Sequence, residues 1–165
     1  MKVAVVVGSL SDSDYAAIAK ETLDGLGVES EFFLLSAHRT PDETIRFAKD
    51  AKRNGFGVII AIAGYAAHLG GVIASHTTLP VICVPVAAGP FNGVDAMLAS
   101  LQMPKGVPTA VTTVGKAGAV NAALLAARIL ALSNKKIAEN IRRYVEESRR
   151  KAAASRSELR KKLGL

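Results

Sequence analysis

The sequence predicts an α/β fold, a single-domain and doubly wound parallel sheet of five strands with a C-terminal helical extension. Five short apolar runs alternate with segments that have helical spacing or helix-start signals, as expected for a parallel sheet with helical crossovers. The third run, residues 58–63, is β-branched and apolar without alternation, which is typical of a strand buried on both faces. A length of 165 residues with 50% hydrophobic content suits one domain with a sizeable core.

Turn and cap residues give the boundaries of the expected elements. Pro41 in a first helical position indicates a helix start, and Gly25 and Gly27 indicate the end of an earlier helix. We expect strands at residues 3–7, about 28–35, 58–63, 79–86 and 109–114. We expect helices after the 8–14 turn up to about 27, from 41 to about 54, at 95–101 and at 119–132. Together these elements predict a three-layer, flavodoxin-like sandwich.

The formal net charge of +7 lies entirely in the C-terminal tail. Residues 1–134 hold ten Lys/Arg and ten Asp/Glu, whereas residues 135–165 hold eleven and four. We interpret the tail as a solvated helix face, with binding to nucleic acid or an acidic membrane surface as the alternative. Its apolar stripe at helical spacing consists of Ile137, Ile141, Tyr144, Val145 and Ser148. We therefore expect an α/β domain at 1–132 and a basic helix at 133–165 that packs on the same or a neighbouring subunit.

Cysteine usage and hydropathy favour a cytoplasmic protein. Cys83 is the one cysteine and lies in an apolar run, so we expect core packing and no intrachain disulfide. The chain starts on a strand-like run without the features of a signal peptide. Residues 57–75 are apolar, but three interior glycines and a histidine suit a strand and a loop better than a membrane-spanning helix.

Two polar turns at expected strand ends have the position of a ligand site. In the turn at 36–41, His38 can donate and accept a proton near neutral pH, and Arg39 can hold a phosphate. From the residues alone, catalysis and a structural role remain equally open for His38. The turn at 8–14 offers hydroxyls and N–H groups for a phosphate, and Asp12 for ribose hydroxyls. Serine and aspartate are also ordinary helix caps, so both interpretations of this turn stand.

Other patterns argue against several classes of site. The three histidines form no cluster with metal-ligand spacing, so we expect no metal. The chain has no Gly-x-Ser-x-Gly elbow, Walker phosphate loop or complete Gly-x-Gly-x-x-Gly fingerprint, which argues against a serine nucleophile, ATP and dinucleotides. We interpret His68 as loop packing or a ligand contact rather than a proton-transfer group. His76, at the end of a short apolar helix, is interpreted as structural.

Five segments closely resemble the 5-aminoimidazole ribonucleotide carboxylase family of purine biosynthesis, namely residues 8–12, 36–41, 66–69, 102–104 and 115–118. The resemblance covers about residues 2–132 in order, and residues 66–69 with Arg39 resemble class I, the N5-carboxyaminoimidazole ribonucleotide mutases. It implies an isomerase that moves a carboxylate from N5 to C4 of the imidazole by decarboxylation and recarboxylation, without a cofactor. The alternatives are a direct CO2-dependent carboxylase and a non-catalytic ribonucleotide-binding homologue.

By matching position, the resemblance implies that His38 is the general acid/base. The implied substrate-binding residues are Ser9, Ser11, Asp12, Ser36, Arg39, Gly64, His68 and Leu69. The serines of the first turn and Arg39 would hold the phosphate, Asp12 the ribose, and the 64–69 loop the base and its carboxylate. The family also implies a homo-octamer in which a neighbouring subunit covers the tail stripe. No nucleic-acid or membrane partner is expected.

The sequence departs from the family pattern in two places beside the expected site. Tyr65 stands where the family usually has glycine, and Gly70 where it usually has proline. Residues 87–91 also differ from the sequence expected there. We expect Tyr65 to narrow the pocket or to add a hydrogen bond, and Gly70 to loosen its loop.

Overall fold

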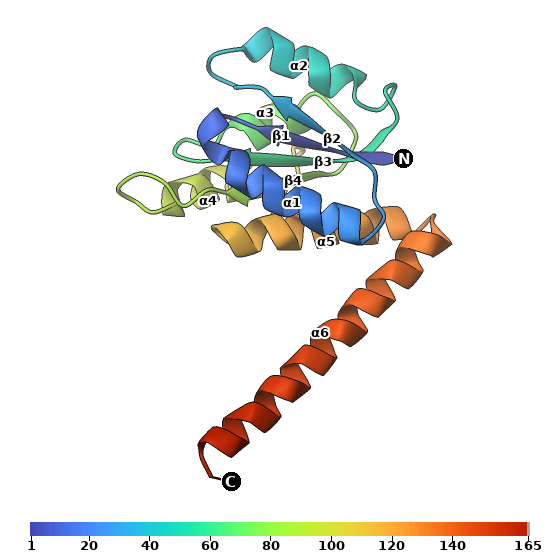
Figure 1. Ribbon diagram of the computed structural model, residues 1–165. Helices are drawn as coiled ribbons and strands as arrows, with labels where there is room; N and C mark the ends of the chain where they lie inside the picture. The colour runs from blue at the N-terminus through green and yellow to red at the C-terminus, as the bar shows by residue number, and fades with distance from the viewer. Residues whose placement is uncertain (165) are drawn as a thin grey trace.

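The computed structural model describes residues 1–164 and shows a five-stranded parallel sheet between two layers of helices (Figure 1). The strands are β1 (Lys2–Val7), β2 (Ser30–Leu34), β3 (Phe56–Ala63), β4 (Val81–Pro85) and β5 (Ala110–Val111). The helices are α1 (Ser13–Gly25), α2 (Pro41–Asp50), α3 (Leu69–Ala74), α4 (Val94–Leu101), α5 (Lys116–Ala131) and α6 (Lys135–Lys162), with a 3₁₀ turn η1 (Leu10–Asp12) before α1. The predicted fold class is confirmed.

The strand order β2-β1-β3-β4-β5 places a topological switch point at β1 and β3. The chain moves from β1 to one edge of the sheet and then returns past β1 to build the other half. In the register of the sheet, Val7 pairs with both Leu34 and Ile62, so β1, β2 and β3 end at the same level. Ligands bind at such a point, outside the carboxyl ends of the strands. The loops after these three strands are therefore brought together.

Two apolar layers sandwich the sheet, which explains why its central strands are apolar without alternation. Ile60 and Ile62 of β3 pack with α1 and α5, whereas Ile59 and Ala61 lie in the layer formed with α2 and α3. The face of α5 toward the sheet is built from alanines that are fully buried, so that helix lies close to the strands. Cys83 is 2% exposed, as the prediction of core packing requires.

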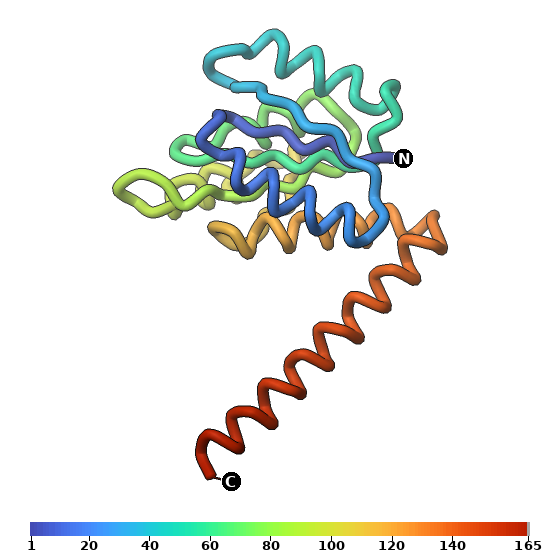
Figure 2. Tube along the Cα trace, in the orientation of Figure 1, coloured from blue at the N-terminus to red at the C-terminus, as the bar shows by residue number. Residues whose placement is uncertain are grey.

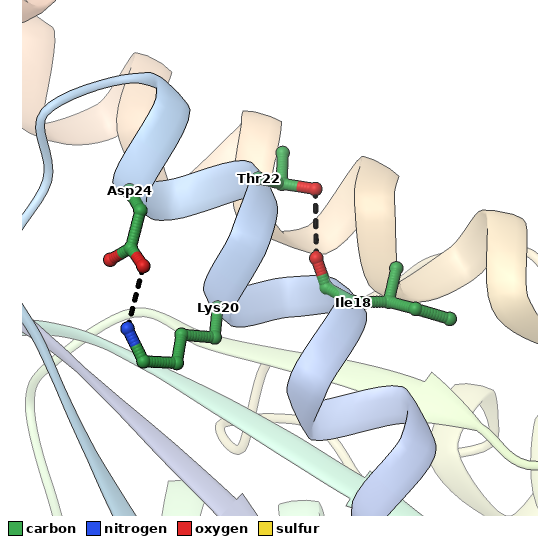
Figure 3. Close-up of polar contacts among 4 residues, drawn as sticks. All are labelled: Ile18, Lys20, Thr22 and Asp24. Carbon is green, nitrogen blue, oxygen red and sulfur yellow. Dashed lines mark hydrogen bonds and ion pairs between the residues drawn. The ribbon is translucent and has the colours of Figure 1, made fainter.

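Helix α1 shows how burial rather than surface pairing holds the helical layer in place. On its exposed side Lys20 and Asp24 form an ion pair of 2.6 Å, and nearer the core the half-buried Thr22 hydroxyl donates to the Ile18 carbonyl at 2.9 Å (Figure 3). Exposed pairs of this kind contribute little to stability. On the other side Leu23 is fully buried in the core, which contributes more.

Several predicted boundaries differ from the structure, those of β5 and of the start of α5 among them, and the expectation for Gly70 was wrong. Strand β5 is limited to two residues, although the Thr112 N–H still donates to the Cys83 carbonyl of β4 at 3.0 Å. Helix α5 begins at Lys116, so residues 116–118 are helical rather than a loop. Gly70 lies in α3 and is buried, and a Cβ there would collide with the Cys83 sulfur. The glycine thus makes room for a core contact, which corrects the expectation of a loosened loop.

Helix α6 leaves the body of the protein and extends away from it (Figure 2). Its start is fixed by Asn134, whose Oδ1 accepts from the Ile137 N–H at 3.2 Å, and by the buried Ile137 side chain. Asn140 Nδ2 donates to the Leu26 carbonyl at 2.8 Å. Beyond Ile141 nearly every side chain of the helix is exposed. No helix within residues 1–164 is long and apolar enough to cross a membrane.

Candidate active site

A pocket of about 410 Å³ lies at the carboxyl ends of β1, β2 and β3. This volume is in the range of small-molecule sites. Its walls are the loops after those strands, and every candidate residue named from the sequence lines it. They are Ser9, Ser11, Asp12, Ser36, His38, Arg39, Gly64, His68 and Leu69. The structure thus brings together side chains from three separate turns.

The turn after β1 is held by its own serines. The Ser9 hydroxyl accepts from the Ser11 N–H at 3.4 Å and caps η1, and the Ser11 hydroxyl donates to Asp12 at 3.2 Å. The capping interpretation of this turn is therefore correct. Because a hydroxyl has two lone pairs as well as a proton, these contacts leave hydrogen-bonding capacity for a ligand.

Asp12 is a buried carboxyl group that lines the pocket and is only 7% exposed. Burial raises its pKa above the ordinary value, and hydrogen bonds from the Ser11 hydroxyl and the Ser9 backbone oppose that shift. It occupies the N-cap position of α1 but makes no side-chain cap hydrogen bond. A hydroxyl donor from a ligand would stabilise this carboxylate.

The turn after β2 is locked by hydrogen bonds between Ser36 and residues 39–40. The Ser36 hydroxyl accepts from the Arg39 N–H at 3.2 Å, and its backbone N–H donates to the Thr40 hydroxyl at 3.0 Å. The Thr40 N–H donates to the Ser36 carbonyl at 2.8 Å. Ser36 therefore fixes the backbone that presents His38 and Arg39.

Arg39 reaches across the end of β1. Its Nη2 donates to the Gly8 carbonyl at 3.2 Å, which places the guanidinium beside the serine turn. The guanidinium has five N–H donors, and this contact uses one of them. A positive charge next to serine hydroxyls and the start of a helix is an arrangement suited to a phosphate group.

His38 and His68 are in direct contact, which the sequence interpretation of His68 missed. His38 Nε2 lies 2.8 Å from His68 Nδ1, and the ring centroids are 4.8 Å apart at 70°. One imidazole donates and the other accepts, so a proton can pass between them inside the pocket. The strand order is what would have revealed this contact of the two histidines, because β2 and β3 flank β1 and their loops converge above its end.

The loop after β3 forms the last wall with small residues and two larger ones. Leu69 is 2% exposed, so its side chain belongs mainly to the core beneath the pocket. Gly64 packs closely on the loop after β4, where a Cβ would lie 3.4 Å from Val86 and Ala88 carbons. Tyr65 is 60% exposed at the rim. Within residues 1–164 no three His, Cys, Asp or Glu side chains gather closely enough to hold a metal ion.

Comparison with known proteins agrees with this geometry. A family profile described as AIR carboxylase matches residues 2–151. The N5-carboxyaminoimidazole ribonucleotide mutase of Saccharolobus solfataricus is 46% identical over 157 residues, covering 95% of this chain and 98% of the relative. The Bacillus subtilis protein of the same name is also 46% identical over 157 residues, covering 95% and 97%.

A solved structure gives the same result for the fold. The crystal structure of Treponema denticola PurE superposes with a TM-score of 0.85 at 31% sequence identity, covering 95% of this chain and 97% of that chain. The sequence match and the structural match both extend over nearly the whole length. The chain belongs to the AIR carboxylase family.

Proposed function

We propose that this protein is an N5-carboxyaminoimidazole ribonucleotide mutase of purine biosynthesis, an isomerase that moves a carboxylate from N5 to C4 of the imidazole. The observation that carries the proposal is the pair of hydrogen-bonded histidines beside a turn suited to a phosphate. Relatives that carry this name match the chain at 46% identity over 95% of its length. That identity supports the mutase over the direct CO2-dependent carboxylase and the non-catalytic homologue.

The pocket can bind each part of an anionic ribonucleotide with a different turn. Ser9, Ser11 and Arg39 hold the phosphate, and the Asp12 carboxylate accepts hydrogen bonds from the ribose hydroxyls. Residues 64–69 and Ser36 enclose the imidazole and its carboxylate. Anchoring the phosphate and ribose leaves the base in front of the histidine pair, where the chemistry occurs.

The reaction needs one proton to be added at N5 and one proton to be removed from C4. His38 protonates N5, the bond from N5 to the carboxyl carbon breaks, and its electron pair returns to nitrogen as CO2 is released. C4 then attacks the CO2 carbon, and His38 removes the proton from C4. Atoms and electrons balance without an oxidant or reductant, so no redox cofactor is required. The contact with His68 gives the proton a second position between the two steps.

An assay with purified protein tests this function. N5-carboxyaminoimidazole ribonucleotide is supplied without ATP or metal in CO2-depleted buffer, and the C4-carboxylated product is followed. Product formation supports the mutase. Failure here, together with carboxylation when CO2 and aminoimidazole ribonucleotide are supplied, identifies the direct carboxylase. Absence of both products, with the ribonucleotide still bound, identifies a non-catalytic homologue.

The proposed active form is a homo-octamer in the cytoplasm. Apolar side chains exposed on β2 and α4 support an assembly, because surface patches of this kind usually mark interfaces. They include Phe32, Leu34, Val94, Leu98 and Leu101. We assign residues 1–132 to the catalytic domain and 133–165 to a basic helix whose exposed stripe is covered by a neighbouring subunit, with no nucleic-acid or membrane partner.

A further inference from the structure

Tyr65 has a backbone conformation that side chains rarely adopt. Its φ is 52°, in the left-handed region, where a bulky residue is disfavoured. Such outliers persist where the surrounding structure holds them, and they concentrate at functional sites. Tyr65 lines the pocket, directly after Gly64 and ahead of two alanines.

The tyrosine ring lies on Gly89, in the loop that follows β4. A Cβ at Gly89 would be 2.6 Å from Tyr65 Cε1 and 3.1 Å from Cδ1, so the ring covers that glycine. Both residues belong to the segments in which the chain departs from the family pattern. The two departures are far apart in sequence but meet in the structure. The large side chain of Tyr65 packs on Gly89, which has no side chain.

This contact lies at the side of the pocket that faces the loop after β4. The pocket extends over β2, β1 and β3, and β4 is the next strand in the sheet. Tyr65 is the only large side chain between residues 63 and 67, the others being glycine or alanine. Its ring therefore lies between the pocket, which it lines, and Gly89 of the loop after β4.

We propose that Tyr65, seated on Gly89, is a positioning residue that retains the CO2 released from N5 until C4 captures it. The inference rests on the proposed function, since only a two-step transfer has a free CO2 to lose. The phosphate and ribose stay anchored by charge and hydrogen bonds, whereas CO2 is small and uncharged. Only a steric barrier can hold it, and closure of an active site is a known way to prevent escape.

An isotope experiment measures this retention. N5-carboxyaminoimidazole ribonucleotide with ¹³C in its carboxylate is converted in buffer containing unlabelled bicarbonate, and the label in the C4-carboxylated product is determined by mass spectrometry. With the unaltered protein, the product should retain the ¹³C label. Tyr65→Gly and Tyr65→Asn remove the ring and tolerate the left-handed backbone, and both should lose label and release free aminoimidazole ribonucleotide. Loss of about half the label means that escape is as fast as recapture.

Two further variants separate the ring from other effects. Tyr65→Phe keeps the ring and should retain label like the unaltered protein. Gly89→Asn tolerates the left-handed φ of 68° at this position, leaves Tyr65 in place but pushes its ring, and should lose label. Full retention in a folded Tyr65→Gly or Tyr65→Asn protein overturns the inference, and so does label loss in Tyr65→Phe. Absence of any product from the unaltered protein instead refutes the proposed function.

Discussion

The imidazole of His38 is the group on which the proposed chemistry depends, and it contacts a second imidazole of the pocket, that of His68. We expect His38→Asn to preserve substrate binding and to lower kcat by at least ~100-fold, the lower end of general acid/base catalysis. Steady-state kinetics gives kcat, and ligand titration gives the affinity. His68→Asn is the matched variant and should lower kcat by a smaller factor, since His38 remains. Nearly normal turnover of His38→Asn would refute its role.

Asp12 gives a prediction for stability as a function of pH. Burial raises its pKa in the folded state, so the folded protein binds the proton more tightly than the unfolded chain does. Stability contributed by the protonated form is therefore complete below the ordinary aspartate pKa and is lost as the pH rises through the raised one. Asp12→Asn carries no charge, so it should melt a few degrees higher than the unaltered protein near pH 7 and bind the ribonucleotide more weakly.

Melting curves across the acidic range check this sign. The gain in melting temperature of Asp12→Asn should shrink as the pH falls and vanish once Asp12 is protonated in both states. A gain that is independent of pH would show that packing, rather than the buried charge, controls the effect.

The sequence could predict which residues surround the pocket, but not how they contact each other. Ser9, Ser11 and His38 lie in turns that follow apolar runs, and parallel strands bring such turns to one edge. The contact of His38 with His68 depends on strand order and side-chain conformation, which the local pattern does not contain. The roles of these residues in binding and catalysis remain predictions.

Among the secondary-structure elements, α3 shows why boundaries were harder to predict than strands. The strand at 58–63 was recognisable from its own residues, whereas Gly70, expected in a loop, lies in α3 against Cys83 of β4, a contact that the local pattern does not reveal. Gly70 allows α3 to lie against Cys83, and burial raises the pKa of that thiol to about 11. Cys83 therefore stays an uncharged side chain of the core, as a close contact with a helix requires.

We expect Gly70→Ala to lower the free energy of unfolding by about 1–3 kcal/mol, the usual cost of overpacking a core. Urea denaturation measures the change. Cys83→Ala removes the sulfur that the new methyl group would meet, so the double variant should recover part of the loss. If the two effects simply add, the contact between these residues is not the cause.

At the scale of the whole molecule, the basic tail is the part least connected to the rest. Ile137 and Asn140 attach the start of α6 to the body, whereas the following turns carry most of the net charge into solvent (Figure 1). A helix this polar gains little stability without tertiary packing of an apolar face. Its partly buried Val145 continues the stripe of Ile137 and Ile141 beyond the body, which suggests a partner surface on another subunit.

A chain shortened to end at Arg143 tests this arrangement, because it keeps the contacts of Ile137 and Asn140. Its melting temperature should stay close to that of the full chain, while sedimentation should show a smaller assembly. Val145→Asp should weaken the assembly more than Ala153→Asp, which introduces the same charge at an exposed position. If shortening leaves the assembly unchanged, the patches on β2 and α4 are sufficient. The tail would then be a solvated helix, or a nucleic-acid contact whose affinity falls with salt at a slope near −0.9 per phosphate neutralised.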